Sequence, residues 1–448
     1  MFKIVMSDLH IGAGRIPEGN LLEDFEQDDE FAALLADLAA ESEAEGREAE
    51  LILNGDIFEF WQVPSLKNPD DYDPKKRYPS RCYLRTREQD SLNRIILILR
   101  GHPIVVAALK DWLRAEAPQR SLTIIKGNHD MQTHWPAVQD AIRDALEAHG
   151  DREPLLRFEP VNVSRDGVFI EHGHQYADPL NRHPNMLEPY HTLDRRRIRM
   201  VPGGSISIRV VNRLEREHYW ISSVKPLPSL FWFLWRFHTR AAIRLVLLML
   251  PHLPRLLWLH RPLTQSSKQL AQEIREMEAD FNGNGSNGET ATEHEDLIGL
   301  PSFDRVLTDK EIANDPLLSH GLLEEHYLHA RLHQVARRKV REEGARVVVF
   351  GHTHVPSVER MKGGGVWINS GSWTWMLDMG AAPAQAWRRL IKHEDLHDVH
   401  YHLNYARIDY EENGTLRARL LEHGAEDGPN RRPLREALAL EEAERVAT

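Results

Sequence analysis

Residues 122–130 read Leu-Thr-Ile-Ile-Lys-Gly-Asn-His-Asp, an apolar run followed at once by side chains that can bind a metal ion or a phosphate. The same order, apolar residues and then a short polar motif, occurs five times in the chain. The motifs are Asp8-Leu9-His10, Gly55-Asp56, Gly127-Asn128-His129-Asp130, His172 and Gly351-His352-Thr353-His354. Short apolar runs indicate strands buried on both faces. In the N-terminal third they alternate with helix-like segments such as 28–46 and 88–116, which predicts an α/β fold.

The placement of the motifs predicts one shared site. In an open α/β sheet the carboxyl ends of the strands face the binding crevice. Side chains two residues apart in a strand point to the same side of the sheet. We therefore expect Asp8 and His10 to reach into one pocket, and His352 and His354 to do the same.

The motifs supply a donor set for metal ions. It consists of two carboxylates, one amide oxygen and four imidazoles, with no thiolate: Asp8, Asp56, Asn128, His10, His172, His352 and His354. This mixture suits Mn, Fe, Zn or Co better than Mg or Ca. Seven ligands exceed what one ion with an open position needs. They fit two divalent ions, Mn first among them, that share one bridging carboxylate.

Taken jointly and in this order, the five motifs resemble those of the calcineurin-like metallophosphoesterases, over residues 1–175 and 345 to about 420. The resemblance implies two metal ions bridged by Asp56. One ion would be held by Asp8, His10 and His354, and the other by Asn128, His172 and His352. His129 would contact the phosphate and protonate the leaving oxygen. Glu59 stands where the family often places an acid that orients this histidine, although a surface glutamate is the alternative.

The function that the resemblance implies is a metal-dependent phosphoesterase. Two cations lower the pKa of a shared water, neutralise the phosphate oxygens and hold both ends of an in-line displacement. We expect hydrolysis of a phosphate monoester, diester or pyrophosphate by a hydroxide that bridges the two ions, with a phosphorylated small molecule or lipid-like compound as substrate.

The resemblance also implies a fold, and the break in the strand and helix alternation after about residue 176 indicates an insertion. The expected fold is a four-layer α/β/β/α sandwich of two mixed sheets with a large, mainly helical insertion. The expected units are a first core part at 1–175, a helical cap at 176–335 with a disordered loop near 280–296, a second core part at 336–423 and a charged tail at 424–448.

A second resemblance concerns the substrate. The sequence Gly55-Asp56-Ile57-Phe58-Glu59-Phe60-Trp61 is similar to the corresponding motif of the UDP-2,3-diacylglucosamine hydrolases, which cut a lipid pyrophosphate at a membrane surface. That group carries an arginine where this chain has His129, and its insertion is much smaller. In protein serine/threonine phosphatases the second motif continues to Asp-Arg-Gly. This chain has Glu59-Phe60-Trp61 there, which argues against a protein phosphatase. A non-enzymatic scaffold that docks on anionic membrane is a further alternative, although no ligand position is lost.

Charge is distributed unevenly along the chain. The formal net charge is −12, yet the window 195–261 contains 13 basic and two acidic residues. This asymmetry indicates a local anionic partner and argues against nucleic acid. The apolar stretch 230–260 carries Arg236, Arg240 and Arg244 at helical spacing. Such a helix would either lie on anionic lipid or cover the core with its arginines exposed.

The compartment is expected to be the cytoplasm, with peripheral contact at the inner face of the membrane. No basic and apolar leader precedes the first strand. Cys82 is the only cysteine, which excludes an intrachain disulfide.

Two further polar stretches are candidates for the rim of the site. The first contains His174, Asp178, Asn181 and His183, which could line a substrate pocket or merely form a turned loop. The second, Asn369-Ser370-Gly371-Ser372, resembles a late loop of the family near the site, and an ordinary turn is its alternative.

Overall fold

The computed structural model describes residues 1–14, 20–177, 180–216, 220–221, 223–225, 235, 243, 316–361, 365–375, 377–378, 402–411 and 414–424. This part of the chain is an α/β protein with two mixed sheets, as the sequence predicts. The segment 230–260, apart from residues 235 and 243, lies outside the described residues, as do the loop near 280–296 and the tail after Gly424.

The first sheet has six strands in the order β15-β14-β1-β2-β3-β4. Their bounds are β1 (Phe2–Met6), β2 (Ala49–Asn54), β3 (Arg120–Ile125), β4 (Leu156–Glu159), β14 (Asn404–Tyr410) and β15 (Leu416–Glu422). Strands β1 to β4 pair in parallel, whereas β14 is antiparallel to both β1 and β15. The carboxyl ends of β1, β2 and β3 therefore lie at one edge.

The second sheet has five strands in the order β11-β12-β10-β6-β5. Their bounds are β5 (Asn162–Arg165), β6 (Val168–Glu171), β10 (Val347–Phe350), β11 (Ser357–Arg360) and β12 (Val366–Asn369). Strand β10 is parallel to β6 and β12, and the outer strands are antiparallel. A tight turn at Asp166-Gly167 joins β5 and β6, and both residues have positive φ.

Successive residues of a strand pack on opposite faces of its sheet, in different apolar clusters. Ile4 and Met6 pack beneath the helices, whereas Val5 faces the second sheet. In β10, Val349 faces the first sheet and Val348 packs against the other side, in the same core as Leu332. The strands are thus buried on both faces, which explains why their sequences are continuous apolar runs.

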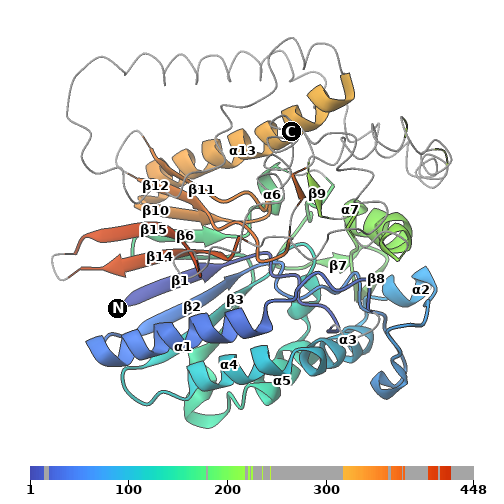
Figure 1. Ribbon diagram of the computed structural model, residues 1–448, viewed down its shortest axis with the longest axis horizontal. Coiled ribbons are helices and arrows are strands. Elements are labelled where there is room, and N and C mark those ends of the chain that lie inside the picture. Colours follow the sequence, from blue (N-terminus) through green and yellow to red (C-terminus); the bar gives the residue numbers. More distant parts are fainter. Residues whose placement is uncertain are drawn as a thin grey trace, which may run out of the picture.

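Helices lie on the outer face of each sheet (Figure 1). The first sheet is covered by α1 (Asp28–Glu45), α3 (Glu88–Gly101), α4 (Pro103–Leu113) and α5 (Pro136–Ala145). The second is covered by α13 (Pro316–Glu343), which continues across the boundary expected at 335. The predicted end of the first helix is confirmed, because Gly46 adopts a left-handed conformation with φ of 64°.

The remaining described elements are short. They are α2 (Ser80–Tyr83), α6 (His174–Ala177), β7 (Tyr190–His191), β8 (Asp194–Ile198), α7 (Pro202–Ile206), α8 (Asn212–Glu215), β9 (Val224–Lys225), β13 (Leu377–Asp378) and the single-turn helices η1 (Pro69–Asp71), η2 (Met131–His134), η3 (Gly150–Leu155) and η4 (Ser207–Val211). Val201 and Ile208 form an apolar cluster with Leu22, Trp61 and Tyr83. The first part of the expected insertion is therefore packed on the core.

Within the described residues, no single helix is long and apolar enough to cross a membrane. Helices α3 and α4 reach the required length and composition only as a pair, bent by 90°. Their residues Ile95, Ile98 and Trp112 are buried in the core beneath the first sheet.

Candidate metal centre

The motif residues lie in tight turns beyond the strands, so the strand-alternation argument for their direction is wrong. Strand β1 ends at Met6, and Asp8 and His10 have φ of 55° and 51°. Strand β10 ends at Phe350, and His352 and His354 have φ of 71° and 63°. In this left-handed region the chain turns sharply, and the turn rather than the pleat aims the side chains.

The first cluster joins residues from both sheets. Asp8 and His10 follow β1, and His354 follows β10. His354 Nε2 lies 3.3 Å from Asp8 Oδ1 and 3.3 Å from His10 Nε2. One atom from each residue lies within 4.8 Å of the others, so the three could hold a metal ion.

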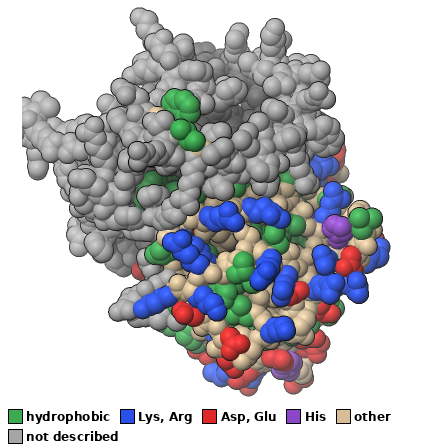
Figure 2. All heavy atoms as spheres, turned by 90° about the vertical axis from the view of Figure 1, so that its right-hand side faces the viewer, with side chains coloured by type: hydrophobic (Ala, Val, Ile, Leu, Met, Phe, Trp, Pro, Cys, Tyr) green, Lys and Arg blue, Asp and Glu red, His purple; other side chains and the backbone are tan. Residues whose placement is uncertain are grey.

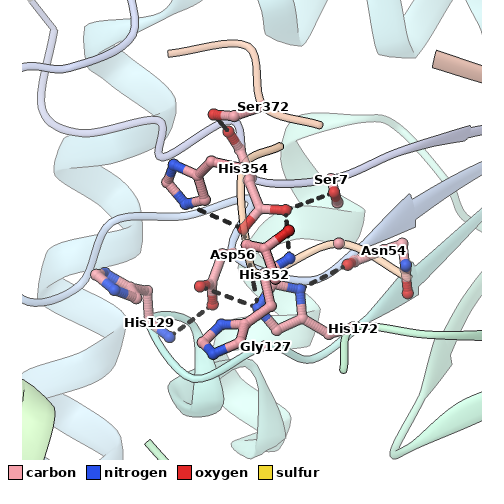
Figure 3. Close-up of polar contacts among 12 residues, drawn as sticks. Ser7, Asn54, Asp56, Gly127, His129, His172, His352, His354 and Ser372 are labelled. Carbon is pink, nitrogen blue, oxygen red and sulfur yellow. Dashed lines mark hydrogen bonds and ion pairs between the residues drawn. The ribbon is translucent and has the colours of Figure 1, made fainter. Parts of the chain in front are cut away.

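The second cluster consists of Asp56, His172 and His352, whose ligand atoms also lie within 4.8 Å of one another. His172 Nε2 is 3.1 Å from Asp56 Oδ2 and 3.9 Å from Asp8 Oδ1. The second cluster is thereby adjacent to the first. Figure 3 shows Asp56, His172 and His352 close together, with His354 above them and His129 to the left of Asp56.

Asn128 is the remaining candidate ligand, and both its position and its side-chain oxygen, unpaired in the described part of the chain, are consistent with that role. It lies in the turn after β3, next to His129, whose backbone N–H donates to Asp56 Oδ1 at 2.7 Å. The Asn128 side chain is buried, and its Oδ1 has no hydrogen-bond partner among the described residues. A buried carbonyl oxygen without a donor is costly, and a cation would satisfy it.

Glu59 lies between two of the predicted histidines. Its Oε2 is 2.9 Å from His10 Nδ1 and 2.5 Å from His129 Nδ1. Its Oε1 accepts a hydrogen bond from the backbone N–H of Trp61, whose ring stacks on His129 at 3.7 Å between centroids. The carboxylate is buried, so it is not a surface glutamate. It fixes the orientation of both rings and leaves the Nε2 atoms for other partners.

Sequence reasoning gave no role to three residues that support the clusters. Ser7 Oγ donates to Asp8 Oδ2 at 2.5 Å, and Asn54 O lies 3.0 Å from His172 Nδ1. Asp130 accepts from the backbone N–H of Gly127 and of Ile57, and so joins the turns after β3 and β2. Asp130 is the last residue of the Gly-Asn-His-Asp motif, and this position in the sequence could have indicated its supporting role. Such outer contacts commonly orient metal ligands.

The two rim candidates also lie near the clusters. Ser372 Oγ donates to the backbone carbonyl of Asp8 at 2.8 Å, and Ser370 Oγ is 2.7 Å from Ser7 Oγ. The ring of His174 lies 5.3 Å from that of His172, and it is buried with neither nitrogen hydrogen-bonded among the described residues.

The other members of the first rim stretch are placed differently. His183 lines a small cavity of about 10 Å³ with Asn128, Gln132 and Arg199. Asn181 packs against Gly203 at the start of α7. Asp178 lies outside the described residues.

Opposite charges hold one another ionised in the clusters. Burial raises the pKa of Asp56, but the imidazoles of His172 and His129 outweigh it and hold this pKa well below its ordinary value. Burial lowers the pKa of His172, but the carboxylates of Asp56 and Asp8 raise it to about 10. Burial raises the pKa of Glu59, but His129 and His10 lower it to about 2. A divalent cation would replace these protons on the same atoms.

The described chain is therefore an α/β protein with buried histidine and carboxylate clusters that could hold metal ions. No protein-family model matches the sequence, and no curated protein matches it either.

Proposed function

We propose that this protein is a dinuclear-metal-dependent phosphoesterase of the calcineurin-like type. One observation carries the proposal. Four motifs from two sheets form adjacent buried clusters, Asp8–His10–His354 and Asp56–His172–His352, and His129 of the fifth motif donates its backbone N–H to Asp56. The motif order in the sequence supports it independently.

The proposed ligand assignment follows the clusters. Asp8, His10 and His354 would hold one ion, Asn128, His172 and His352 would hold the other, and Asp56 would be shared by both. Interactions of Asp56 with both clusters support a bridging role, since its Oδ2 lies 3.1 Å from His172 Nε2 and the charge of His10 helps to lower its pKa. Two divalent ions, Mn first among the candidates, would acidify a shared water and neutralise the phosphate oxygens.

His129 is the proposed acid that protonates the leaving oxygen. Its Nδ1 contacts Glu59, so that a proton on Nε2 is presented away from the carboxylate. Trp61 stacks on the ring and fixes its plane. An imidazole that is positioned by a carboxylate can deliver a proton near neutral pH.

The substrate is proposed to be a phosphorylated small molecule or a lipid-like phosphate or pyrophosphate. Among the described residues, Arg195, Arg196 and Arg197 are exposed on β8, in the first part of the basic window. A positively charged surface attracts such substrates and anionic membrane alike.

The proposal is tested by hydrolysis of p-nitrophenyl phosphate and bis-p-nitrophenyl phosphate with and without added Mn²⁺. We expect Mn²⁺-dependent turnover of at least one ester, and the preferred ester separates monoesterase from diesterase. Asp56→Asn should abolish turnover, whereas Asp140→Asn, an acid on the outer helix α5, should not. A folded, Mn²⁺-treated protein that cleaves neither ester would instead support the scaffold.

A further inference from the structure

A cavity of about 180 Å³ is lined by none of the candidate metal ligands and has no role in the proposed chemistry. Its wall is formed largely by the loop 72–78, together with Gln62, Tyr83 and Arg216. The space greatly exceeds the roughly 10–15 Å³ that one water needs. It is therefore large enough for a substrate group.

The cavity is lined by cations. Lys75, Lys76, Arg77 and Arg216 contribute to its surface, and no described carboxylate lines it. Within the described chain, no carboxylate forms an ion pair with Lys76, Arg77 or Arg216. Two carboxylates lie close to Gln62, a residue of the cavity wall. Asp24 and Glu215 both accept hydrogen bonds from Gln62 Nε2.

The walls of the cavity are held in place. Arg216 donates to the Lys76 carbonyl at 3.1 Å and to the Tyr83 hydroxyl at 2.5 Å. The rings of Tyr72 and Tyr78 stack with an angle of 17° between their planes. Positioned guanidinium and ammonium groups beside tyrosine hydroxyls match the oxygens of a phosphate group.

Trp61 connects the cavity to the proposed catalytic machinery. Gln62 lines it, and the preceding residue, Trp61, stacks on His129. Leu22 and Tyr83 line the cavity and pack in the same apolar cluster as Trp61. Figure 2 shows Lys and Arg side chains gathered on the side of the molecule where α2, α7 and β8 lie.

We infer that this cavity is a second anion site, which binds a phosphate group of the substrate remote from the ester that is cut. The preferred substrates are then molecules with two phosphate groups, one at the metal centre and one at Arg77 and Arg216. The link to catalysis rests on the proposed function, whereas phosphate binding in the cavity does not.

The first test counts phosphate sites by calorimetry on the full chain with Mn²⁺ and inorganic phosphate. We expect two binding events in the wild type and the loss of one in Arg77→Gln, or its weakening by about tenfold or more. Lys76→Gln should weaken the same event. Arg81→Gln, which removes an exposed arginine of α2 outside the cavity, should leave both. A profile unchanged in both cavity variants would overturn the inference.

The second test measures inhibition of p-nitrophenyl ester hydrolysis by alkyl monophosphates and by α,ω-alkanediol bisphosphates of increasing length. One length should inhibit about tenfold more strongly than the monophosphate, and Arg77→Gln should remove that advantage without changing monophosphate inhibition. Equal inhibition at every length would contradict the link to catalysis. If the protein has no hydrolytic activity, the proposed function fails, and the phosphate event lost in Arg77→Gln still decides whether the cavity binds anions.

Discussion

At the scale of single residues, the centre combines strained backbone with charged side chains. Seven described residues other than glycine have positive φ, and five of them are candidate ligands: Asp8, His10, Asp56, His352 and His354. Each such conformation costs about 1–3 kcal/mol and persists only where the surroundings impose it. Hydrogen bonds from Ser7 to Asp8, and from the backbone N–H of Ile57, next to Asp56, to Asp130, supply part of that restraint. The strain supports the view that these turns serve a ligand rather than the fold.

His129→Ala tests the acid role. Activity on esters with poor leaving groups should fall by about 10²–10⁴-fold, because an alkoxide needs a proton, and p-nitrophenyl esters should lose much less. Metal content should stay as in the wild type. His149→Ala, an exposed histidine after α5, is the control. Equal losses on both kinds of ester would rule out proton transfer by His129.

Gly127→Ala tests the packing of the turn after β3. A Cβ at this position would overlap the carboxylate and backbone nitrogen of Asp56. We expect metal affinity to drop by about tenfold or more, as when supporting contacts are lost. Gly46→Ala is the matched control, since its Cβ enters open space and only its φ of 64° is strained. Wild-type metal affinity in Gly127→Ala would show that this turn can shift freely.

At the scale of elements, the sequence predicted best what is buried on both faces. The runs at β1, β2, β3, β6 and β10 are continuous and apolar because helices or a sheet cover each side. The sequence analysis did not assign β4, β11 and β15, whose residues are mostly partly exposed and interspersed with charges. The residues of the centre were predictable because each motif is contiguous. Their directions were not, because left-handed turns replace the strand pleat.

The junction of α3 and α4 makes stability depend on pH through His102. This buried histidine has Nδ1 2.9 Å from Asp28 and Nε2 3.5 Å from Glu23. Glu23 in turn accepts from the backbone N–H of Gly12 and Gly14, in the loop after β1. Burial lowers the pKa of His102, but the hydrogen bond to Asp28 and the nearby carboxylate of Glu23 raise it from 6.5 to about 9. Its stabilisation is therefore complete below about pH 6.5 and is lost as the pH rises through about 9.

His102→Gln should lower the free energy of unfolding by about 2–3 kcal/mol at pH 6 and by about 1 kcal/mol or less at pH 9.5. Urea unfolding of variant and wild type at the two pH values measures the difference. His149→Gln replaces an exposed histidine, and its effect on the free energy of unfolding should be the same at both pH values. A difference that is constant with pH would mean that His102 is not charged in the native protein.

At the scale of the whole molecule, the centre joins the two sheets. Asp8, His10, Asp56 and Asn128 belong to turns of the first sheet, whereas His172, His352 and His354 follow strands of the second. Each cluster draws on both sheets, so bound ions would link them (Figure 3). The sequence could not show which ligands belong to which sheet, because strand order depends on pairings between residues that are hundreds of positions apart.

Removal of metal should therefore lower the stability of the entire fold. A ligand at about 1,000 times its dissociation constant stabilises the native state by about 4 kcal/mol. Scanning calorimetry with Mn²⁺ and with a chelator should give melting temperatures several degrees apart. In Asp56→Asn the separation should be much smaller, and in Asp140→Asn unchanged. Identical melting temperatures in the wild type would show that the clusters bind no ion in the folded state.

The most direct test of the central claim is the number of metal ions per chain. The full chain is loaded with Mn²⁺, freed of excess ions by desalting and analysed by elemental mass spectrometry, with circular dichroism to establish that it is folded. We expect about two ions per chain in the wild type and fewer in Asp56→Asn. A folded wild-type chain that retains no ion would contradict this claim.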